Sequence, residues 1–114
     1  DFEESSDEEG RFIQRGDWMV DFMRHVITFE GRLLELTPTE FDLLVYMIGE
    51  APRVISPQEL VNEAQGYDCE SWEAGDIVRY HIHNIRGKIE KTTGRTDVIR
   101  NIRGVGYTVG EDSA

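Results

Sequence analysis

Basic side chains gather in the last third of this 114-residue chain. Residues 76–109 contain seven Lys or Arg side chains and three acidic ones, a net charge of +4, whereas the whole chain carries −11. The rest of the chain therefore carries −15. Cations that concentrate on one segment of an acidic protein form an electrostatic footprint for a polyanion. The residue types in this segment predict a surface that binds a negatively charged partner.

A helix predicted from about Ala74 to about Lys91 gives these side chains a common surface. Its apolar stripe has the spacing of one buried helical face and consists of Val78, Ile82, Ile85 and Ile89. The side chains on the opposite face are open to a partner: Arg79, Tyr80, His83, Asn84, Arg86 and Gly87. The major groove of DNA admits one α-helix, in which Arg can pair with guanine and Asn with adenine. A charged helical face is more often only solvated, so the helix alone does not distinguish a DNA-binding face from a solvated one.

A predicted β-hairpin changes that balance. Residues 98–103 and 107–109 have the pattern of two short strands on either side of residues 104–106. Asn101 and Arg103 are two apart in the first strand, so their side chains project on the same side, beside the preceding helix. A helix and a hairpin that agree in charge favour a nucleic-acid surface over a solvated face.

The sequence argues against catalytic and metal chemistry. His81 and His83 are two apart on the predicted helix, which puts them on different faces, so neither a metal site nor a cofactor is predicted. The glycines at 104 and 106 are not a dinucleotide-binding loop, because that loop needs a following helix and only four residues come after Gly110. No nucleophile and base have a spacing that suggests catalysis, so we do not predict an enzyme.

Length and composition predict one ordinary globular domain, with 39% apolar and 31% charged residues. No apolar run approaches the roughly 18 residues of a membrane helix, so no membrane partner is predicted. Cys69 is the only cysteine, which excludes an internal disulfide and suits a reducing cytoplasm. The chain begins with Asp rather than Met, and we expect it to be a piece of a longer protein.

The first 36 residues divide into a tail and a small sheet. Residues 1–10 hold six acids and no base, which predicts a disordered tail or linker. Alternating apolar residues then predict an antiparallel meander of three or four strands. Its last hairpin joins residues 25–29 to residues 32–36, with Gly31 supplying the positive φ of a tight turn.

Two helices are predicted between this sheet and the basic helix. Thr37-Pro38-Thr39-Glu40 and Ser56-Pro57-Gln58-Glu59 each combine an N-cap hydroxyl, a proline and a carboxylate, so each predicts a capping box. The inward residues are Phe41, Leu44, Val45 and Ile48 in the first helix and Leu60, Val61 and Ala64 in the second. The first helix is expected to end at residues 50–52 and the second at Gly66, and residues 66–75 read as an ordered surface loop.

Four motifs in this order strongly resemble the OmpR/PhoB-type winged-helix domain, the DNA-binding output module of bacterial two-component response regulators. They are residues 36–44 (LTPTEFDLL), 56–60 (SPQEL), 78–89 (VRYHIHNIRGKI) and 99–107 (IRNIRGVGY). The resemblance covers about residues 12–109, and the last motif is its most specific part. It implies an α+β winged helix-turn-helix fold, with an N-terminal antiparallel sheet, three helices and a C-terminal β-hairpin wing. The domain would span residues 11–110, between the acidic tail 1–10 and a short tail 111–114.

The resemblance also implies sequence-specific binding of double-stranded DNA and control of transcription. The third helix would enter the major groove and the wing would reach the neighbouring minor groove. By position, Tyr80 and Asn84 match base-facing sites, and His81, His83 and Arg86 match sites that contact the DNA backbone. Arg79 and Lys88 complete the predicted DNA-binding residues of the helix, and Asn101 and Arg103 are those of the wing.

Further partners are implied in the same way. The loop at residues 66–75, with Tyr67, Asp68 and Trp72, would face RNA polymerase, and family members pair head to tail on direct repeats under the control of a receiver domain. Asp76 stands where the family usually has Arg, Arg79 where an acid is usual, and Gln65 where Trp is common. The alternative is a winged-helix module that binds proteins, such as the polymerase or its own receiver, with little DNA binding.

Overall fold

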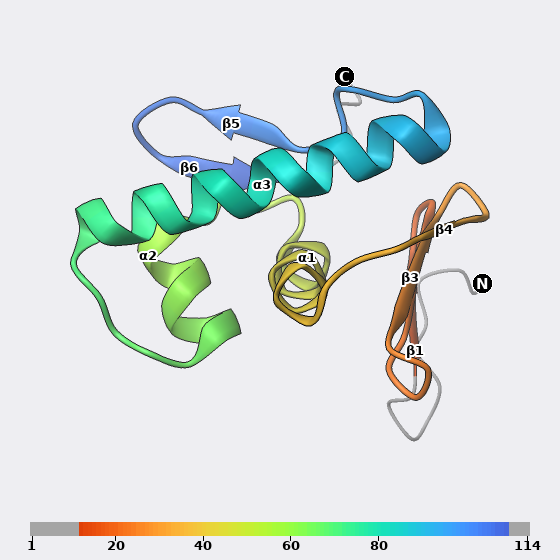
Figure 1. The fold of residues 1–114 in the computed structure, drawn as a ribbon, viewed down its shortest axis with the longest axis horizontal. Helices are drawn as coiled ribbons and strands as arrows, with labels where there is room; N and C mark the ends of the chain where they lie inside the picture. Colours follow the sequence, from red (N-terminus) through yellow and green to blue (C-terminus); the bar gives the residue numbers. More distant parts are fainter. Residues whose placement is uncertain (1–11, 110–114) are drawn as a thin grey trace.

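The structure, a computed structural model, describes residues 12–109, so the predicted tails at residues 1–10 and 111–114 lie outside the described residues (Figure 1). Its strands are β1 Phe12–Arg15, β2 Trp18–Asp21, β3 Val26–Phe29, β4 Arg32–Leu34, β5 Arg100–Ile102 and β6 Gly106–Thr108. Its helices are α1 Pro38–Glu50, α2 Pro57–Glu59, which continues as the π-helical turn η1 Leu60–Gln65, and α3 Ser71–Thr93. The predicted winged-helix fold is confirmed.

The first four strands form one antiparallel sheet in the order β1-β2-β3-β4, as predicted. Glu30 and Gly31 turn between β3 and β4 with φ of 55° and 78°, so the glycine supplies the expected positive φ. The inward side chains of the sheet are buried: Trp18, Val20, Ile27, Phe29 and Leu34. The sheet stands at one end of the molecule, beside the C-terminal end of α3 (Figure 1).

Helix α1 occupies the centre of the fold, and its predicted capping box is confirmed. The Thr37 hydroxyl accepts from the Glu40 amide at 3.2 Å, and the Glu40 carboxylate accepts from the Thr37 amide at 3.0 Å. Arg15 of β1 donates to the carbonyl oxygens of Ile48 and Gly49, both at 2.8 Å. Since the last turn of α1 has no basic residue of its own, this guanidinium caps the helix and ties it to the sheet.

The buried face of α1 differs slightly from the predicted one. It consists of Phe41, Leu43, Leu44, Met47 and Ile48, together with the Glu40 side chain. Val45, which was expected inside, is only half-buried. Because α1 is covered on more than one side, its buried surface is wider than a single stripe and includes Leu43 and Met47, which were not predicted.

The second predicted capping box is only half formed. The Ser56 hydroxyl accepts from the Glu59 amide at 3.1 Å, but the Glu59 carboxylate does not return to the cap. It binds the Arg53 guanidinium at 2.6 Å and accepts from the Tyr46 hydroxyl at 2.5 Å instead. The hydrogen bond to Glu59, together with burial, raises the pKa of Tyr46 to about 12. The prediction was wrong because a tertiary partner competes for the carboxylate.

The segment η1 ends at Gly66, the residue at which the second helix was predicted to end. Leu60 and Val61 are buried and Ala64 is half-buried. Gly66 closes the segment in the left-handed conformation with φ of 83°, and its amide donates to the carbonyl of Val61, five residues back. Such an i to i−5 hydrogen bond is the pattern of a π-helix.

Helix α3 begins at Ser71, three residues before the predicted start at Ala74. Glu70 and Glu73 form a reciprocal cap at this end, so Trp72 and Gly75 belong to the helix and the connecting loop is only residues 67–70. The predicted stripe of Val78, Ile82, Ile85 and Ile89 is buried, and Gly94 ends the helix with φ of 81°. No helix within residues 12–109 is both long enough and apolar enough to cross a membrane.

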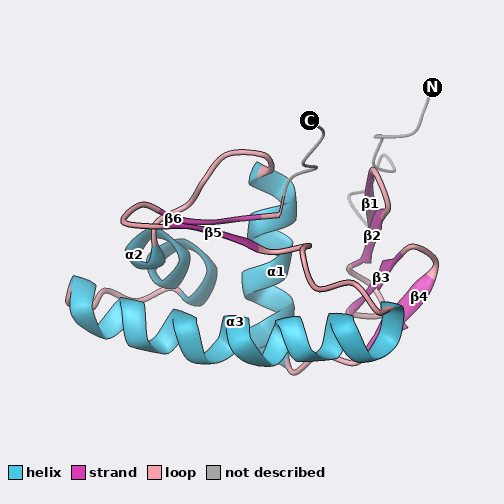
Figure 2. Ribbon diagram, turned by 90° about the horizontal axis from the view of Figure 1, so that it is seen from above, coloured by secondary structure: helices cyan, strands magenta, loops and turns pink. Residues whose placement is uncertain are grey.

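All the other elements lie on one side of α3. Figure 2 shows α1, α2, the hairpin and the sheet together on that side, with the helix exposed along its length on the other. The buried stripe therefore determines which side chains α3 presents outward.

The wing is joined to the rest of the fold through Ile55. Strand β5 pairs with β6 in antiparallel register, and Ile55 and Tyr107 exchange backbone hydrogen bonds of 2.8 and 2.9 Å. Arg103 lies in the turn at residues 103–105 rather than in a strand, and Gly104 takes the positive φ of 78°. Gly106 has no positive φ; a Cβ there would lie 2.0 Å from the Ile55 carbonyl oxygen. Only Gly104 therefore serves the turn, and Gly106 permits close contact with the strand-like segment at Ile55.

We expect Gly106→Ala to lower the free energy of unfolding more than Gly104→Ala. A left-handed residue other than glycine costs roughly 1–2 kcal/mol. The alanine methyl group at position 106, by contrast, would collide with backbone atoms of Ile55 that cannot move independently. Urea denaturation followed by circular dichroism measures both. Equal losses in the two variants would show that the Ile55 contact does not constrain the wing.

Candidate nucleic-acid interface

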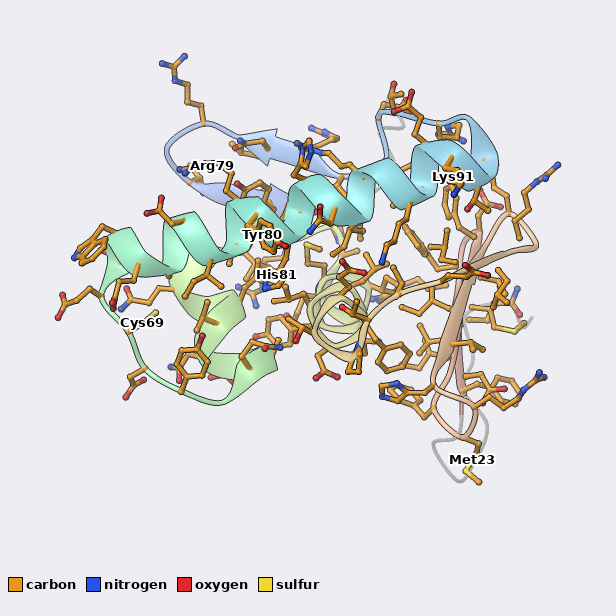
Figure 3. All side chains as sticks on the ribbon, in the orientation of Figure 1. Met23, Cys69, Arg79, Tyr80, His81 and Lys91 are labelled. Atoms are coloured by element: carbon orange, nitrogen blue, oxygen red, sulfur yellow. The ribbon has the colours of Figure 1, made fainter. Side chains whose placement is uncertain are left out.

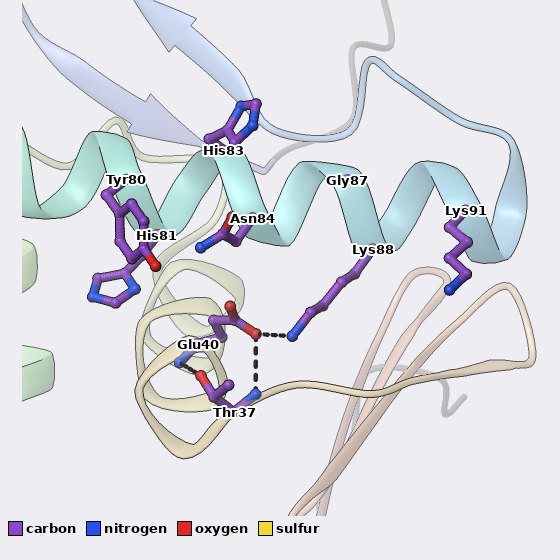
Figure 4. A pocket seen from close by; sticks show the side chains of 9 residues that line it. All are labelled: Thr37, Glu40, Tyr80, His81, His83, Asn84, Gly87, Lys88 and Lys91. Atoms are coloured by element: carbon purple, nitrogen blue, oxygen red, sulfur yellow. Dashed lines mark hydrogen bonds and ion pairs between the residues drawn. The ribbon is translucent and has the colours of Figure 1, made fainter.

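The outward surface of α3 borders a groove of about 510 Å³ between this helix and the start of α1 (Figure 4). Its lining residues are Tyr80, His81, His83, Asn84, Gly87, Lys88 and Lys91 of α3, with Thr37 and Glu40 of α1. Five of the seven helix residues predicted to bind DNA, Tyr80, His81, His83, Asn84 and Lys88, are thus brought together. Arg79 and Arg86 do not line the groove.

Four positions of α3 form its outward line. Tyr80, Asn84, Gly87 and Lys91 are spaced by four, three and four residues, which places them on one helical face. Tyr80 is 64% exposed, and its ring meets the His81 ring edge-on at 5.1 Å between centroids. Figure 3 shows Tyr80, His81 and Lys91 at the surface of the helix. This line carries one aromatic, one amide and one cationic side chain, which can meet the edges of bases and the phosphates beside them.

The two histidines leave α3 on different sides, as predicted. Figure 4 shows His81 on the side of α1 and His83 on the side of the hairpin. They cannot converge on one ligand atom, but each can donate a hydrogen bond to a separate acceptor.

Lys91 was not among the predicted site residues, although it lines the groove. The signal that identifies it is its spacing, four residues after Gly87 on the outward line. Thr37 was predicted only as a helix cap, and its place in the groove depends on tertiary packing that sequence spacing does not reveal.

The charge of Lys88 is paired with a carboxylate of the same domain. Its ammonium group lies 2.6 Å from the Glu40 carboxylate, whose side chain is only 4% exposed while that of Lys88 is 35% exposed (Figure 4). Burial by itself raises the pKa of Glu40, but the hydrogen bonds from Lys88 and from the Thr37 amide outweigh it, so the pKa lies below its ordinary value. The pair joins the first turn of α1 to the second turn from the end of α3.

Arg86 is also engaged within the fold. Its Nε and one terminal nitrogen donate to the Ile99 carbonyl oxygen at 3.3 and 2.9 Å. These bonds tie the helix to the segment that leads into β5, so this side chain positions the wing relative to α3. Its predicted contact with a DNA phosphate stays a prediction, with two of the five guanidinium N–H donors directed at Ile99.

Arg79 pairs with Asp76 at 3.0 Å, and both side chains are largely exposed. The two residues are three apart on α3, so they form an i, i+3 ion pair. An exposed pair of this kind contributes little to stability. Its main effect is to reduce the positive charge at this end of the outward face.

Arg95 is held away from the outward line. Its guanidinium lies 3.2 Å from Asp97 and 2.5 Å from Glu30, and it covers the Phe29 ring at 5.8 Å. The hydrogen bond to Asp97 and the negative charge of that carboxylate raise the pKa of Arg95. Within residues 12–109, the Lys91 and Arg103 side chains make no hydrogen bond or ion pair. Much of the positive charge counted in the sequence is therefore neutralised internally.

The wing presents Asn101, in β5, and Arg103, in the turn, and both side chains are exposed. Val105 is exposed at the turn beside them. The wing tip thus combines one amide, one unpaired cation and one apolar side chain, next to the outward face of α3.

The other end of α3 has a different character. Tyr67 and Trp72 are exposed, Trp72 by 69%, and the surrounding acids are Asp68, Glu70, Glu73 and Asp76. We call these six residues the acidic aromatic patch. Burial and the neighbouring acids Glu73, Asp68 and Glu70 raise the pKa of Cys69, which keeps this thiol protonated. A surface of this composition repels phosphates and suits a protein partner instead.

Comparisons with known proteins agree with this geometry. Residues 31–109 match the family model described as "Transcriptional regulatory protein, C terminal". The DNA-binding response regulator MtrA of Mycolicibacterium smegmatis is 32% identical over 106 residues, which are 93% of this chain and 46% of that protein. The chain spans about half the length of the curated relatives it matches.

Solved structures have the same fold. The DNA-binding domain of CpxR from E. coli is similar with a TM-score of 0.71 and 26% identity, over 88% of this chain and 96% of that one. The AdeR DNA-binding domain, solved in complex with an intercistronic region, gives a TM-score of 0.68 and 28% identity over 83% of this chain and 95% of that one.

We expect Glu40→Gln to destabilise the fold at pH 7 by roughly 1–3 kcal/mol, because Lys88 loses its carboxylate but can still reach water. The folded pKa of Glu40 is depressed, so its contribution is complete above the unfolded value of about 4.3 and disappears as pH falls through the folded value. Urea denaturation at pH 7 and at acid pH should show a gap between variant and wild type that closes on acidification.

The matched control is Asp42→Asn, which removes an exposed acid from the same helix. It should change stability much less at pH 7. A Glu40→Gln variant as stable as Asp42→Asn would mean that the buried pair does not hold α1 and α3 together.

Proposed function

Because this chain belongs to the family of transcriptional regulatory protein C-terminal domains, the OmpR/PhoB-type DNA-binding domains of response regulators, we propose that it binds double-stranded DNA sequence-specifically to control transcription. The observation that carries the proposal is the outward line of α3. Tyr80, Asn84, Gly87 and Lys91 share one helical face that borders the groove, and Tyr80, Gly87 and Lys91 are exposed there.

Helix α3 is the element that enters the major groove. An α-helix with its side chains is about 10–12 Å across and the groove is about 12 Å wide, so one helix fits. Asn84 lies midway along the outward line and can pair with adenine through its amide. Tyr80 offers an apolar ring and a hydroxyl to a neighbouring base or sugar.

The contacts to the DNA backbone come from groups at the edges of this line. Lys91 and Arg103 have unpaired cationic side chains, and His81 and His83 flank the helix on its two sides. Arg103 and Asn101 carry the contact across to the neighbouring minor groove. Phosphate contacts fix the position of the helix but do not read sequence.

The acidic aromatic patch serves a protein partner in this proposal. Tyr67, Asp68 and Trp72 are the residues we assign to contact with RNA polymerase, because they are exposed and lie outside the groove. The chain spans about half of its relatives, so we also propose a receiver domain in the longer protein, head-to-tail pairing on DNA and a cytoplasmic location. The domain itself carries out binding rather than catalysis.

A second function is favoured by the internal pairing of Lys88, Arg79 and Arg95. A winged helix with few free cations and an acidic aromatic patch could bind proteins and very little DNA. A gel shift on random duplex in low salt separates the two. The proposed function requires a shifted band, and the protein-binding alternative predicts none.

Asn84→Ala should reduce discrimination between the preferred site and random DNA by about 1–3 kcal/mol at one base pair, since the amide reads a base edge. Selection from random duplexes, followed by affinity measurements on the selected site, tests this. Asn62→Ala, at an exposed position of η1, is the control and should leave the selected site unchanged. If Asn84→Ala selects the same site as the wild type with the same preference, Asn84 does not read a base.

Arg103→Ala should keep the fold, judged by circular dichroism, and weaken DNA binding about threefold or more through loss of one charged contact. The control is Arg24→Ala, which removes the same charge from the exposed β2–β3 turn. Binding that falls equally in both variants would indicate a general charge effect. Binding that is unchanged in Arg103→Ala would assign the wing a purely structural role.

A further inference from the structure

Gly87 is a glycine in the interior of a long helix, and the fold does not explain it. It is exposed, seven residues from the C-cap glycine of α3. A Cβ built at this position would meet no heavy atom within 4 Å, and its φ is not in the positive region that favours glycine. Glycine is among the least favourable residues in a helix interior. Neither packing nor backbone geometry within the domain therefore calls for glycine here.

A second glycine of α3 shows what is distinctive about Gly87. Gly75 also has open space around its Cβ position. The two are twelve residues apart, which is about 18 Å along the axis and about a third of a turn around it. Gly75 is half-buried and lies outside the groove, whereas Gly87 lines it. Gly75 is thus a control position on the same helix, with open space around its Cβ position but away from the groove.

The neighbours of Gly87 indicate why a glycine occupies this position. Gly87 lies between Asn84, three residues before it, and Lys91, four residues after it, on the outward line (Figure 4). We infer that Gly87 is a contact position for DNA, where the absence of a side chain sets how closely the backbone of α3 approaches the bases. This inference rests on the proposed function and assigns a specificity-determining role that deepens it.

The physical basis is the difference in reach between the side chains on the outward line. The Asn84 amide is only two carbon atoms from the backbone, so it meets a base edge only when the helix lies deep in the groove. Tyr80 and Lys91 are long enough to keep contact if the helix moves outward. A side chain at position 87 would occupy the space that the duplex needs and would hold the helix away. Base reading by Asn84 is therefore lost before the general attraction to phosphates.

Three variants test the inference: Gly87→Ala, Gly87→Leu and Gly75→Ala. The readouts are the thermal midpoint of unfolding and fluorescence-anisotropy affinities for a duplex selected by the wild type and for a random duplex, at one salt concentration. Each substitution replaces glycine by a better helix former, so each alanine variant should raise the midpoint by roughly 4–8 °C. For the selected duplex, we expect affinity to fall about threefold or more in Gly87→Ala and about tenfold or more in Gly87→Leu.

The same substitutions should have much smaller effects elsewhere. Affinity for the random duplex should change less than about twofold in every variant, because phosphate contacts tolerate a shift of the helix. Gly75→Ala should bind the selected duplex as the wild type does. Gly87→Ala, which fills open space, keeps the test valid if Gly87→Leu disturbs the fold.

Two results overturn the inference, and they are distinguishable. If the wild type binds the selected duplex and both Gly87 variants bind it equally well, the glycine has no role in approach, while the proposed function stands. If the wild type binds no duplex at all, the proposed function fails and the inference fails with it.

Discussion

Burial of one face of α3 is the constraint on which the rest of the molecule depends. Val78, Ile82 and Ile85 enter the core, and the rotation that buries them turns the line from Tyr80 to Lys91 outward. Two polar contacts then fix the helix in place. Glu40 holds Lys88 against the start of α1, and the Ile99 carbonyl holds Arg86 against the approach to the wing. The side chains of α3 that face outward are those that neither enter the core nor take part in these two contacts.

This arrangement changes the meaning of the charge pattern. The basic segment has a net charge of +4, but several of its cations already have partners within the domain: Arg79, Arg86, Lys88 and Arg95. The attraction to a polyanion therefore rests on a small number of free groups, and recognition depends more on shape and hydrogen bonding than on charge. The acidic aromatic patch lies at the other end of α3, so the surface proposed for a protein partner is separate from the surface proposed for DNA.

Local signals in the sequence predicted the architecture well. The hairpin glycine, the cap at Thr37, the stop at Gly66 and the buried stripe of α3 all depend on residues close in sequence. The errors arose where a residue distant in sequence determines the contacts of a side chain. The Glu59 carboxylate left its predicted cap for Arg53 and Tyr46. The close contact with Ile55 that requires glycine at position 106 was not predicted at all. The start of α3 was missed because a glutamate pair, Glu70 and Glu73, forms its cap without a hydroxyl residue.

The candidate site shows the same division. Helical spacing predicted the outward position of Tyr80 and Asn84, but it could not reveal that Lys88 meets a buried carboxylate 48 residues away. NMR titration of amide signals with the selected duplex tests the central claim most directly. The account predicts perturbations along α3 from Tyr80 to Lys91 and in the turn at residues 103–105, with the outer face of the sheet unchanged. Perturbations confined to the acidic aromatic patch, or none at all, would contradict it.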